Sequence, residues 1–418
     1  MNKTILILIM IPLSLISQEE KKDFSHHNLH LTSYVSAELQ NLDMSFVNTM
    51  IFGGFITNEM NKDWISLGND EINKLNSEVR NAIEYKYTRK NFNTYYLEIA
   101  DMNIVNSKFP DDLLRLLLEG NYNYQNHELD FSNTIIRANR YQQYKVGYEQ
   151  YIKENIRLNT AISYLNGNHH ISYIIDEGVL YTHDMGNEID INYNIKSLIT
   201  DTSNISLFNS NGNGAAIDIG LSYFPNTNNM YYLSIKNLGY INWDKNSIIS
   251  TADSNFLFSG IEAQDLDDII DYNDSINSFD INSIYMSENK RFRSFIPTRI
   301  TFSYNRKIDK KYFKNITFLV HSRWQPHEMP EKLTFEYIEK GIEESGYTPS
   351  IDIYTTMETK YFLMYPGVSK GGFTNNMNFH LSISNKKRNI TLGTYHLESL
   401  FNEDISSISG YLQITSRF

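Results

Sequence analysis

The sequence contains no cysteine. This absence excludes disulfide bonds, thiolate zinc sites, a cysteine nucleophile and membrane attachment through a lipidated cysteine. The sequence motifs of nucleotide and zinc enzymes are missing too, since there is no phosphate-binding loop, dinucleotide fingerprint or HExxH. We therefore expect no cofactor.

Long hydrophobic runs are missing after residue 17. No later segment approaches 18 consecutive apolar residues, so further transmembrane helices are excluded. If the mature chain lies in a membrane, only a closed β-barrel can satisfy its backbone groups there. The net charge of −12 also excludes a general affinity for nucleic acid or for anionic membrane surfaces.

The first 17 residues have the pattern of a secretory signal peptide. Lys3 supplies the positive charge, the apolar stretch runs from Ile5 to Ile16, and cleavage is expected before Gln18. An uncleaved anchor is the alternative, but about a dozen apolar residues are too few for a helix that needs ~20 to span a bilayer. We therefore expect export, with a signal peptide at 1–17 and one domain at 18–418.

Aromatic residues are abundant but unevenly chosen, with 30 Tyr and 23 Phe against 3 Trp. A chain rich in aromatic and polar residues suits a structure whose side chains lie at a membrane–water boundary. A soluble all-β protein also favours Tyr and Phe in its strands. Composition alone leaves both alternatives open.

Period-2 alternation dominates the mature chain and predicts β-strands. The clearest segments are Asp190–Lys196, Ile217–Tyr223 and Met377–Ile383, with weaker ones at Leu29–Leu39, Ile156–Tyr164, Tyr231–Ile235, Ile300–Tyr304 and Ile316–Val320. Segments of this kind, separated by Asn, Gly and Asp turns, are typical of membrane barrels. A β-sandwich alternates as well, so the pattern predicts the sheet but not its solvent.

The C-terminal segment favours the membrane. It alternates from Ile408 to the last residue, Phe418, with Ile408, Leu412 and Ile414 on one face. It resembles the terminal strand that the outer-membrane barrel assembly machinery recognises, in which a glycine and a final aromatic residue recur. Gly410 and Phe418 are therefore the candidate assembly signal. The alternative is a soluble domain that ends on a strand.

Three segments interrupt the alternation and predict short helices in loops or in the lumen. The segment 110–120 begins with proline, has acids in its first turn and ends with glycine, which is helix punctuation. Residues 262–272 and 331–344 are weaker candidates. The fold class that follows is all-β: an antiparallel up-and-down transmembrane barrel of about 14 strands, within a range of ~12–16.

Four segments in order resemble a family of uncharacterised outer-membrane barrels that is distantly similar to long-chain fatty-acid transporter barrels. These segments are Arg140–Tyr148, Leu158–Gly167, Asn213–Leu221 and Asn237–Trp243. The resemblance covers the chain from about residue 28 to its end. It implies about 14 strands, an occluded lumen and passage of a hydrophobic small molecule. No functional residue is carried over, because no ligand-binding motif of the transporters matches, and the substrate class is analogy.

One motif suggests catalysis. Residues 367–371 match G-x-S-x-G with Ser369 at its centre, but an alternating strand follows instead of the helix that a nucleophile elbow requires. The glycines are better explained by a flexible hairpin loop. His380 and His396 are the candidate histidine partners, and the sequence cannot pair either with a serine. We expect no catalytic residue.

Three groups of residues could be interpreted as metal ligands. An acidic run at Asp265, Asp267, Asp268, Asp271 and Asp274 lacks the glycine and glutamate of a calcium loop, so a solvated loop is expected. His26, His27 and His30 lie near the mature N-terminus, where we expect disorder. Neighbouring residues such as His169 and His170 face opposite ways on a strand. We expect no metal site.

Three functions remain open. The first is a non-enzymatic outer-membrane barrel that passively transports a hydrophobic small molecule. The second is a structural or anchor subunit of a secretion or surface-attachment assembly, suggested by long polar loops. The third, an outer-membrane esterase, rests on Ser369 alone. The expected partners are outer-membrane lipids, the barrel assembly machinery, a hydrophobic ligand and proteins that bind the loops, with no nucleic acid.

Overall fold

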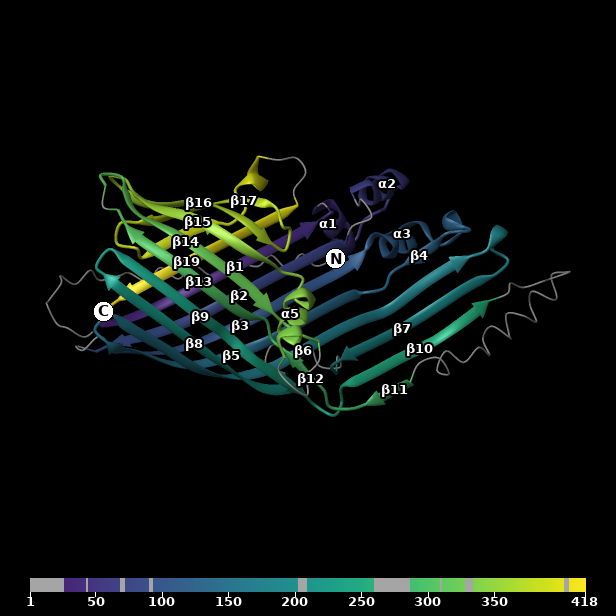
Figure 1. Ribbon diagram of the computed structural model, residues 1–418, viewed down its shortest axis with the longest axis horizontal. Coiled ribbons are helices and arrows are strands. Elements are labelled where there is room, and N and C mark those ends of the chain that lie inside the picture. The colour runs from purple at the N-terminus through teal and green to yellow at the C-terminus, as the bar shows by residue number, and fades with distance from the viewer. Residues whose placement is uncertain are drawn as a thin grey trace, which may run out of the picture.

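A computed structural model places most of the chain in a single antiparallel sheet (Figure 1). The structure describes residues 26–42, 44–67, 72–89, 93–201, 209–258, 286–308, 310–327, 334–401 and 406–418. The predicted signal peptide at 1–17, the acidic run and the segment 262–272 lie outside these residues.

Fourteen antiparallel strands close into a barrel, because the last strand pairs with the first. In order around the barrel they are β1 (His26–Gln40), β2 (Ile72–Thr88), β3 (Thr94–Pro110), β5 (Thr134–Lys153), β6 (Ile156–Thr182), β8 (Gly212–Asn226), β9 (Asn229–Trp243), β13 (Thr298–Lys307), β14 (Phe313–Trp324), β15 (Thr348–Glu358), β16 (Phe362–Gly372), β17 (Met377–Asn385), β18 (Ile390–Thr394) and β19 (Ser407–Arg417). The predicted fold class is confirmed, and every alternating segment singled out in the sequence lies in one of these strands or in β7 (Ile189–Ile199).

The two ends of the barrel differ in their connections. The links β5–β6, β8–β9 and β15–β16 are short turns, and they lie at the same end as Phe418, whose backbone N–H bonds to His27 O at 3.0 Å. We call this the short-turn end. The opposite, long-loop end carries the connections 41–71, 111–133, 183–211, 244–297 and 325–347.

The outward face of the barrel carries an apolar belt. Ile83, Ile99 and Tyr144 are direct cross-strand partners, and the registers continue this row around the wall. The exposed belt residues are Ile83, Leu97, Ile99, Val146, Ile162, Ile217, Ile219, Leu221, Leu233, Ile235, Phe302, Ile316, Ile351, Ile353, Phe379, Ile383 and Leu392. So many large, exposed apolar side chains indicate a surface that contacts the hydrocarbon of a membrane.

A row of polar residues bounds the belt toward the long-loop end. Asp101, Gln142 and Asn166 are consecutive cross-strand partners on β3, β5 and β6. Gln142 Nε2 donates to Asp101 Oδ1 at 3.0 Å, and Asn166 Nδ2 donates to Gln142 Oε1 at 2.9 Å. The outward face therefore changes from apolar to hydrogen-bonded polar within one step along each of these strands.

Strand β6 continues far past the barrel. It has 27 residues, which span roughly 90 Å at about 3.3 Å per residue, three times a hydrocarbon core of ~30 Å. Its first half pairs with β8, and its second half, from Ile171 onward, pairs with β7. With β4 (Glu128–Asp130), β7, β10 (Ile248–Phe258) and β11 (Met286–Asn289) its second half forms the part of the same sheet that continues beyond the barrel, which we call the extension (Figure 1).

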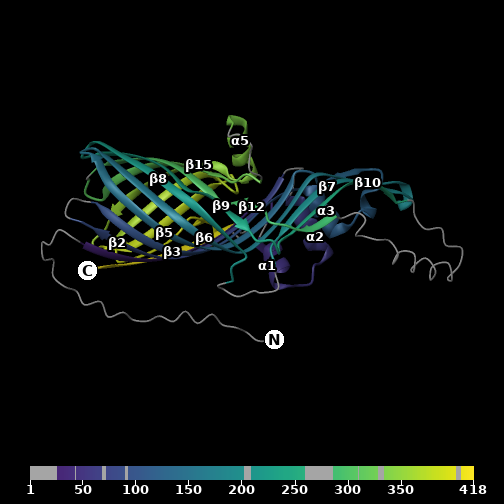
Figure 2. The ribbon, with the colours of Figure 1, turned by 90° about the horizontal axis from the view of Figure 1, so that it is seen from below.

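Helices cover two sides of the long-loop end (Figure 2). Helices α1 (Met44–Phe52), α2 (Asn58–Leu67) and α3 (Asp111–Glu119) lie on one side and α5 (Phe335–Glu344) on the other. Leu39 and Phe109, at the ends of β1 and β3, pack with Trp64 of α2 and Leu114 of α3 in one buried cluster. None of the helices in the described residues is long and apolar enough to cross a membrane.

The helix predictions have mixed outcomes. The predicted helix at 110–120 is confirmed as α3, which begins after Pro110 and ends before Gly120. Within the candidate 331–344, residues 335–344 form α5, with the Thr334 hydroxyl accepting from Tyr337 N at 3.2 Å as its N-terminal cap, and residues 331–333 lie outside the described residues. Helices α1 and α2 were not expected. Segment 44–52 is a short, mainly apolar run, and such a run does not separate a helix from a strand.

Two local expectations are wrong. The glycine-rich segment 367–371 is not a hairpin loop, because Gly367 to Gly371 lie in strand β16 and the hairpin follows after residue 372. The histidines at 26, 27 and 30 are not disordered, because they belong to β1, which is paired on both sides with β19 and β2. Pairing across barrel closure, which a local pattern does not reveal, orders this segment.

Candidate functional site in the barrel lumen

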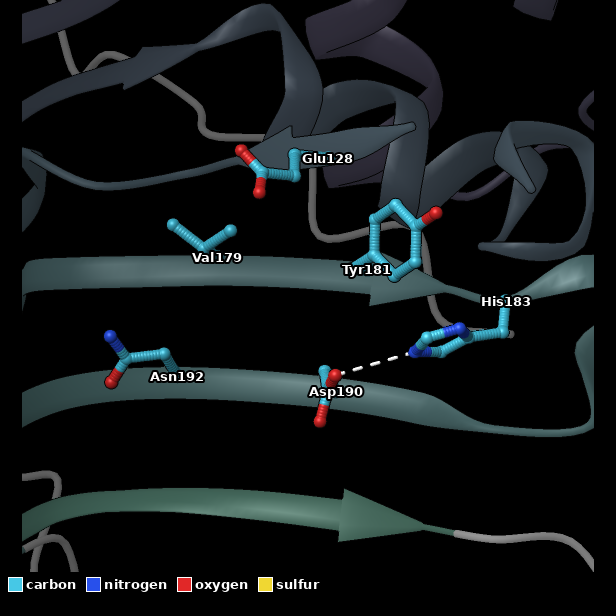
Figure 3. A pocket seen from close by; sticks show the side chains of 6 residues that line it. All are labelled: Glu128, Val179, Tyr181, His183, Asp190 and Asn192. Carbon is cyan, nitrogen blue, oxygen red and sulfur yellow. Dashed lines mark hydrogen bonds and ion pairs between the residues drawn. The ribbon is translucent and has the colours of Figure 1, made fainter. Parts of the chain in front are cut away.

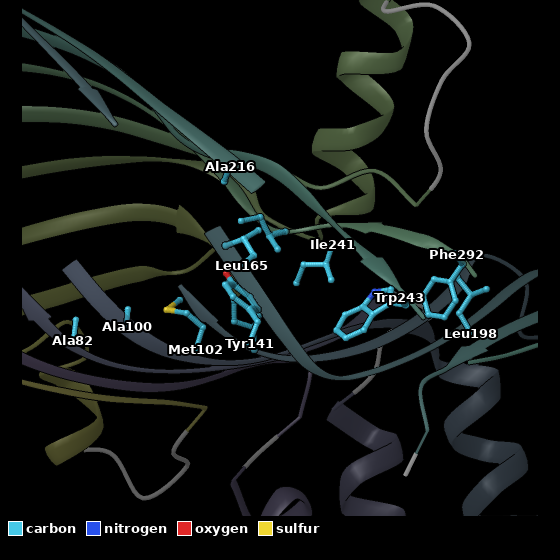
Figure 4. Packing of buried hydrophobic residues seen from close by; sticks show 12 residues of the cluster. Ala82, Ala100, Met102, Tyr141, Leu165, Leu198, Ala216, Ile241, Trp243 and Phe292 are labelled. Atoms are coloured by element: carbon cyan, nitrogen blue, oxygen red, sulfur yellow. The ribbon is translucent and has the colours of Figure 1, made fainter. Parts of the chain in front are cut away.

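Buried apolar side chains fill the lumen toward the long-loop end (Figure 4). We call this group the apolar layer. Its members are Ala82, Ala100, Met102, Ile104, Tyr141, Leu165, Leu198, Ala216, Ile241, Trp243, Phe292 and Ile296. They come from strands on one half of the barrel, from β7 of the extension (Leu198) and from the connection between β9 and β13.

Trp243 is the largest side chain of the apolar layer and is fully buried. Its Nε1 donates to Ser294 Oγ at 2.8 Å, and Ser294 belongs to β12 (Arg293–Phe295), which pairs with the end of β9. The rings of Phe292 and His170 lie 6.2 and 5.4 Å from the Trp243 ring, centroid to centroid. The sequence did not reveal this cluster, because residues 292–296 enter the lumen only through tertiary folding.

A charged pocket of about 370 Å³ lies directly beside the apolar layer. Its lining residues are Glu84, Lys86, Thr88, Thr94, Tyr96, Glu98, Lys145, Glu149, Tyr151, Arg157, Asn159, Asp218 and Lys236. On β5, Tyr141 belongs to the apolar layer and Lys145 lines the pocket, four residues nearer the short-turn end. The same change from apolar to charged occurs from Ala216 to Asp218 on β8. The two environments are therefore stacked along one lumen.

The pocket charges are mostly paired with one another. Lys145 Nζ lies 2.7 Å from Asp218 Oδ2 and 3.6 Å from Glu98 Oε1, and all three side chains are nearly buried. Arg80 Nη2 reaches Glu98 Oε2 at 2.6 Å, and Arg157 bonds Glu149 at 2.9 Å. Lys236 also lines this pocket and raises the positive potential near Glu98. Pairing of this kind holds charged groups in a confined space.

Tyr96 is one of the residues that line the charged pocket. The Tyr96 ring on β3 lies against Gly147 of β5, where a Cβ would fall 1.9 Å from Tyr96 Cζ. Its hydroxyl donates to Asn159 Oδ1 on β6 at 3.0 Å. The glycine therefore leaves space for a ring that joins three strands.

A second hollow, of about 510 Å³, lies on the extension (Figure 3). We call it the tray. Glu128, Val179, Tyr181, His183, Asp190 and Asn192 line it from β4, β6 and β7 and the segment that joins β6 to β7. His183 Nε2 lies 3.4 Å from Asp190 Oδ2, and the Tyr181 ring meets the imidazole edge-on. The tray is open to solvent.

The β14–β15 connection folds over the mouth of the barrel through α5. Asn106 Nδ2 on β3 donates to Ser345 O at 2.5 Å, and Lys108 Nζ reaches Glu343 Oε1 at 3.2 Å. His327 N donates to Glu344 Oε2 at 2.8 Å. Burial and the neighbouring Arg137 lower the pKa of His327 to about 2, and burial raises the pKa of Glu344.

The candidate catalytic residues are not assembled. Ser369 lies in β16 opposite Asn378, and Gly367, not Ser369, is the partner of His380. His396 bonds Glu398 at 3.1 Å. In the part of the chain that the structure describes, no hydrogen bond joins Ser369 to a histidine.

A serine, histidine and aspartate do meet elsewhere on the lumen wall, where the sequence did not indicate them. Ser350 Oγ lies 2.7 Å from His321 Nδ1, and Asp352 Oδ2 lies 3.4 Å from the same nitrogen. Nε2 of His321 instead contacts the hydroxyl of Tyr347. A catalytic triad needs the serine and the acid on opposite imidazole nitrogens, so this cluster does not have that geometry.

The other predicted residues have clear positions. His169 and His170 face opposite ways, as predicted, with His170 buried against Asn139 and His169 near Arg140 on the outer face. The described residues contain no group of three or more metal-ligating side chains. Gly410 lies in β19, and the exposed Phe418 ring stacks on His27 with a centroid distance of 5.9 Å.

The chain belongs to the family of unknown function DUF5723, which its sequence matches over residues 25–340. The predicted resemblance to an uncharacterised family is thereby confirmed. A search of curated proteins finds no match.

Several solved barrels resemble the structure at low sequence identity. A Pseudomonas aeruginosa FadL homologue has a TM-score of 0.43 at 6% identity, covering 94% of this chain and 90% of its own. The Ralstonia pickettii toluene transporter TbuX has 0.40 at 7%, with coverages of 94% and 88%. The translocator domain of the autotransporter NalP from Neisseria meningitidis has 0.33 at 8%, with coverages of 94% and 88%.

Proposed function

We propose that the protein is a non-enzymatic, integral outer-membrane barrel that passively transports a small hydrophobic molecule with a polar end. The observation that carries this proposal is the stacking of the apolar layer on the charged pocket within one lumen. An apolar group gains by burial in the first, and a polar end finds hydrogen-bonding and charged partners in the second.

The proposed location rests on the outward face. The apolar belt would face the hydrocarbon, and the polar row at Asp101, Gln142 and Asn166 would mark its boundary toward the long-loop end. Export by the segment 1–17 and insertion by the barrel assembly machinery complete the proposal. Outer-membrane lipids are then the first partners of the belt.

Location is tested by heat-modifiable migration of the protein from purified outer-membrane fractions. A closed barrel resists SDS until it is boiled, so the unboiled sample should migrate faster than the boiled one. Recovery in the soluble periplasmic fraction without any such shift would contradict the membrane assignment and the transport proposal with it.

Transport is tested by uptake of labelled fatty acid into proteoliposomes, which should exceed uptake into empty vesicles. Lys236→Gln should slow the uptake severalfold, because it removes a positive charge from the pocket wall. Lys386→Gln is the matched control, since Lys386 lies at the same end but pairs with Glu358 outside the pocket. Uptake no faster than in empty vesicles would refute the proposal.

A second candidate, a structural or anchor subunit of a surface assembly, is favoured by the extension and its tray. A sheet that continues past the barrel offers an exposed platform at the long-loop end. Tagged protein should then co-purify with a partner after gentle detergent extraction. Tyr181→Ala with Asp190→Ala should abolish that co-purification while the barrel remains heat-modifiable. Protein that always purifies alone would count against this role.

The esterase function has the least support. It requires Ser369, and no histidine bonds that serine in the described residues. Unchanged ester hydrolysis in Ser369→Ala would remove its last basis.

A further inference from the structure

One carboxylate in the lumen is shared by two arginines. Glu78 of β2 is fully buried. Its Oε2 accepts from Arg323 Nη2 on β14 at 2.6 Å, and its Oε1 accepts from Arg299 Nη2 on β13. Charge-assisted hydrogen bonds of this kind are the strongest that side chains make.

These bonds cross the barrel. Around the closed wall, β2 is the second strand, β13 the eighth and β14 the ninth of fourteen, so β2 and β14 lie on opposite sides. Most other pairs, such as Arg80 with Glu98 or Arg157 with Glu149, join neighbouring strands. Glu78, Arg299 and Arg323 instead place their side chains across the lumen. We call these three residues the cross-lumen triad.

Aromatic rings hold the triad from the side of β14. The Arg323 guanidinium lies 5.3 Å from the centre of the Tyr347 ring and 4.9 Å from that of Phe373, and Phe373 is nearly fully buried. Cations are attracted to the faces of such rings. Tyr141 of the apolar layer lies close enough to feel the charge of the triad. The triad therefore connects the apolar layer on one half of the barrel with aromatic residues on the other.

We propose that the cross-lumen triad is the gate of the barrel: it keeps the lumen shut to ions, and the lumen opens when Glu78 separates from the two arginines. This inference rests on the proposed function, because it concerns the lumen through which the solute would pass. The carboxylate neutralises one of two adjacent guanidinium groups. Without it, both positive charges lose their partner, repel each other and draw in water and anions.

The test is conductance in planar lipid bilayers. The wild-type protein should be silent, and Glu78→Gln should show current steps with a reversal potential shifted toward that of chloride, because two arginines then line the opening. Asp101→Asn is the matched control and should stay silent. It removes a carboxylate from an ion pair with Arg140, at 3.8 Å, that joins neighbouring strands on the outer face.

A second variant tests the gate independently, in case Glu78→Gln does not fold. The chain has no cysteine, so Glu78→Cys with Arg323→Cys introduces two unique thiols on opposite walls. Conductance should appear in the reduced protein, vanish when a bis-methanethiosulfonate cross-linker bridges the two positions through a disulfide at each cysteine, and return when dithiothreitol reduces those disulfides. The reagent should not change the conductance of the wild-type protein.

Each outcome has a distinct meaning. Silent Glu78→Gln and silent reduced double-cysteine protein, both heat-modifiable, would overturn the gate, as would wild-type protein that already conducts. Fatty-acid uptake measured on the same vesicles separates this result from the proposed function. If the triad variants conduct but the protein takes up no fatty acid, transport alone is refuted. If the protein takes up fatty acid but the triad variants do not conduct, the gate alone is refuted.

Discussion

At the scale of the residue, small side chains decide where large ones fit. Gly147 leaves room for the Tyr96 ring, and Gly367 does the same for the ring of His380, whose Cε1 would lie 2.1 Å from an added Cβ. A glycine weakens an isolated strand, but here its missing side chain leaves space for an aromatic ring from the neighbouring strand. The sequence shows the glycine but not which aromatic ring packs on it, because that pairing depends on strand register.

We predict that Gly147→Ala destabilises the barrel by about 1–3 kcal/mol, the usual cost of overpacking. The added Cβ would collide with the Tyr96 ring. The measurement is the urea midpoint of protein refolded into vesicles. Adding Tyr96→Ala should recover part of the loss. Gly410→Ala is the steric control, since its Cβ meets only Val35 Cγ1 at 4.0 Å. An unchanged midpoint in Gly147→Ala would contradict this packing.

The terminal aromatic residue gives a prediction of a different kind. Phe418 is 68% exposed, so its side chain adds little to the folded barrel. Phe418→Ser should lower the amount of barrel in outer membranes of cells severalfold, as measured by heat-modifiable protein, if Phe418 is an assembly signal. Refolding in vitro should not change. Phe401→Ser, at another exposed phenylalanine, is the control, and equal levels in both variants would reject the signal.

At the scale of the element, the α5 connection combines a histidine and a glutamate whose pKa values move in opposite directions. His327 stays neutral where it is buried, because its pKa is lowered to about 2. Its contribution to docking is therefore present above a pH of about 6.5, the value for free histidine, and is lost progressively as the pH falls. The raised pKa of Glu344 acts in the opposite sense, since its contribution is lost as the pH rises.

We predict that α5 loosens from the barrel mouth on acidification. In a Glu344→Gln background, docking should weaken by about 2 kcal/mol between pH 6.5 and 5, because the released histidine takes up a proton. Hydrogen exchange of residues 335–344, corrected for its intrinsic pH dependence, measures this opening. The effect should disappear when His327→Gln is added. A persistent pH dependence in that variant would assign it to another group.

At the scale of the whole molecule, the position of the apolar belt determines which part of the outer surface faces lipid. Its apolar side chains are neighbours only after the strands are paired in register, and each contributing strand supplies one to three of them. The belt ends at the polar row, and the helices on the long-loop side lie beyond it. This arrangement predicts which exposed apolar residues face lipid.

We predict that Ile162→Arg destabilises the membrane-inserted barrel by about 2–4 kcal/mol, the cost of a charge at the bilayer midplane. Phe55→Arg should change stability by less than about 0.5 kcal/mol, although Phe55 is 87% exposed against 68% for Ile162. Phe55 lies in the connection between α1 and α2, outside the belt. Refolding equilibria in vesicles supply both values, and equal effects would contradict this placement of the membrane.

Local patterns in the sequence predicted the strands that alternate clearly and the faces on which their side chains lie. Alternation at Ile217–Tyr223 and Ile408–Phe418 is local, since a side chain's face follows from its position in the strand, and the structure confirms it. The helix at 110–120 was likewise readable from its proline and glycine. Strand 72–88 was harder to predict, because its lumen face carries paired charges of both signs that resemble a solvated surface.

The contents of the lumen could not be predicted from the sequence, because they depend on contacts between residues far apart in the chain. Glu78 is followed by Arg299 and Arg323 more than two hundred residues later, and nothing local marks them as partners. The apolar layer, the charged pocket and the extension arise in the same way, from strands that meet through closure and register. Periodicity is a property of neighbouring residues, whereas a lumen is formed by residues brought together from opposite sides of a closed sheet.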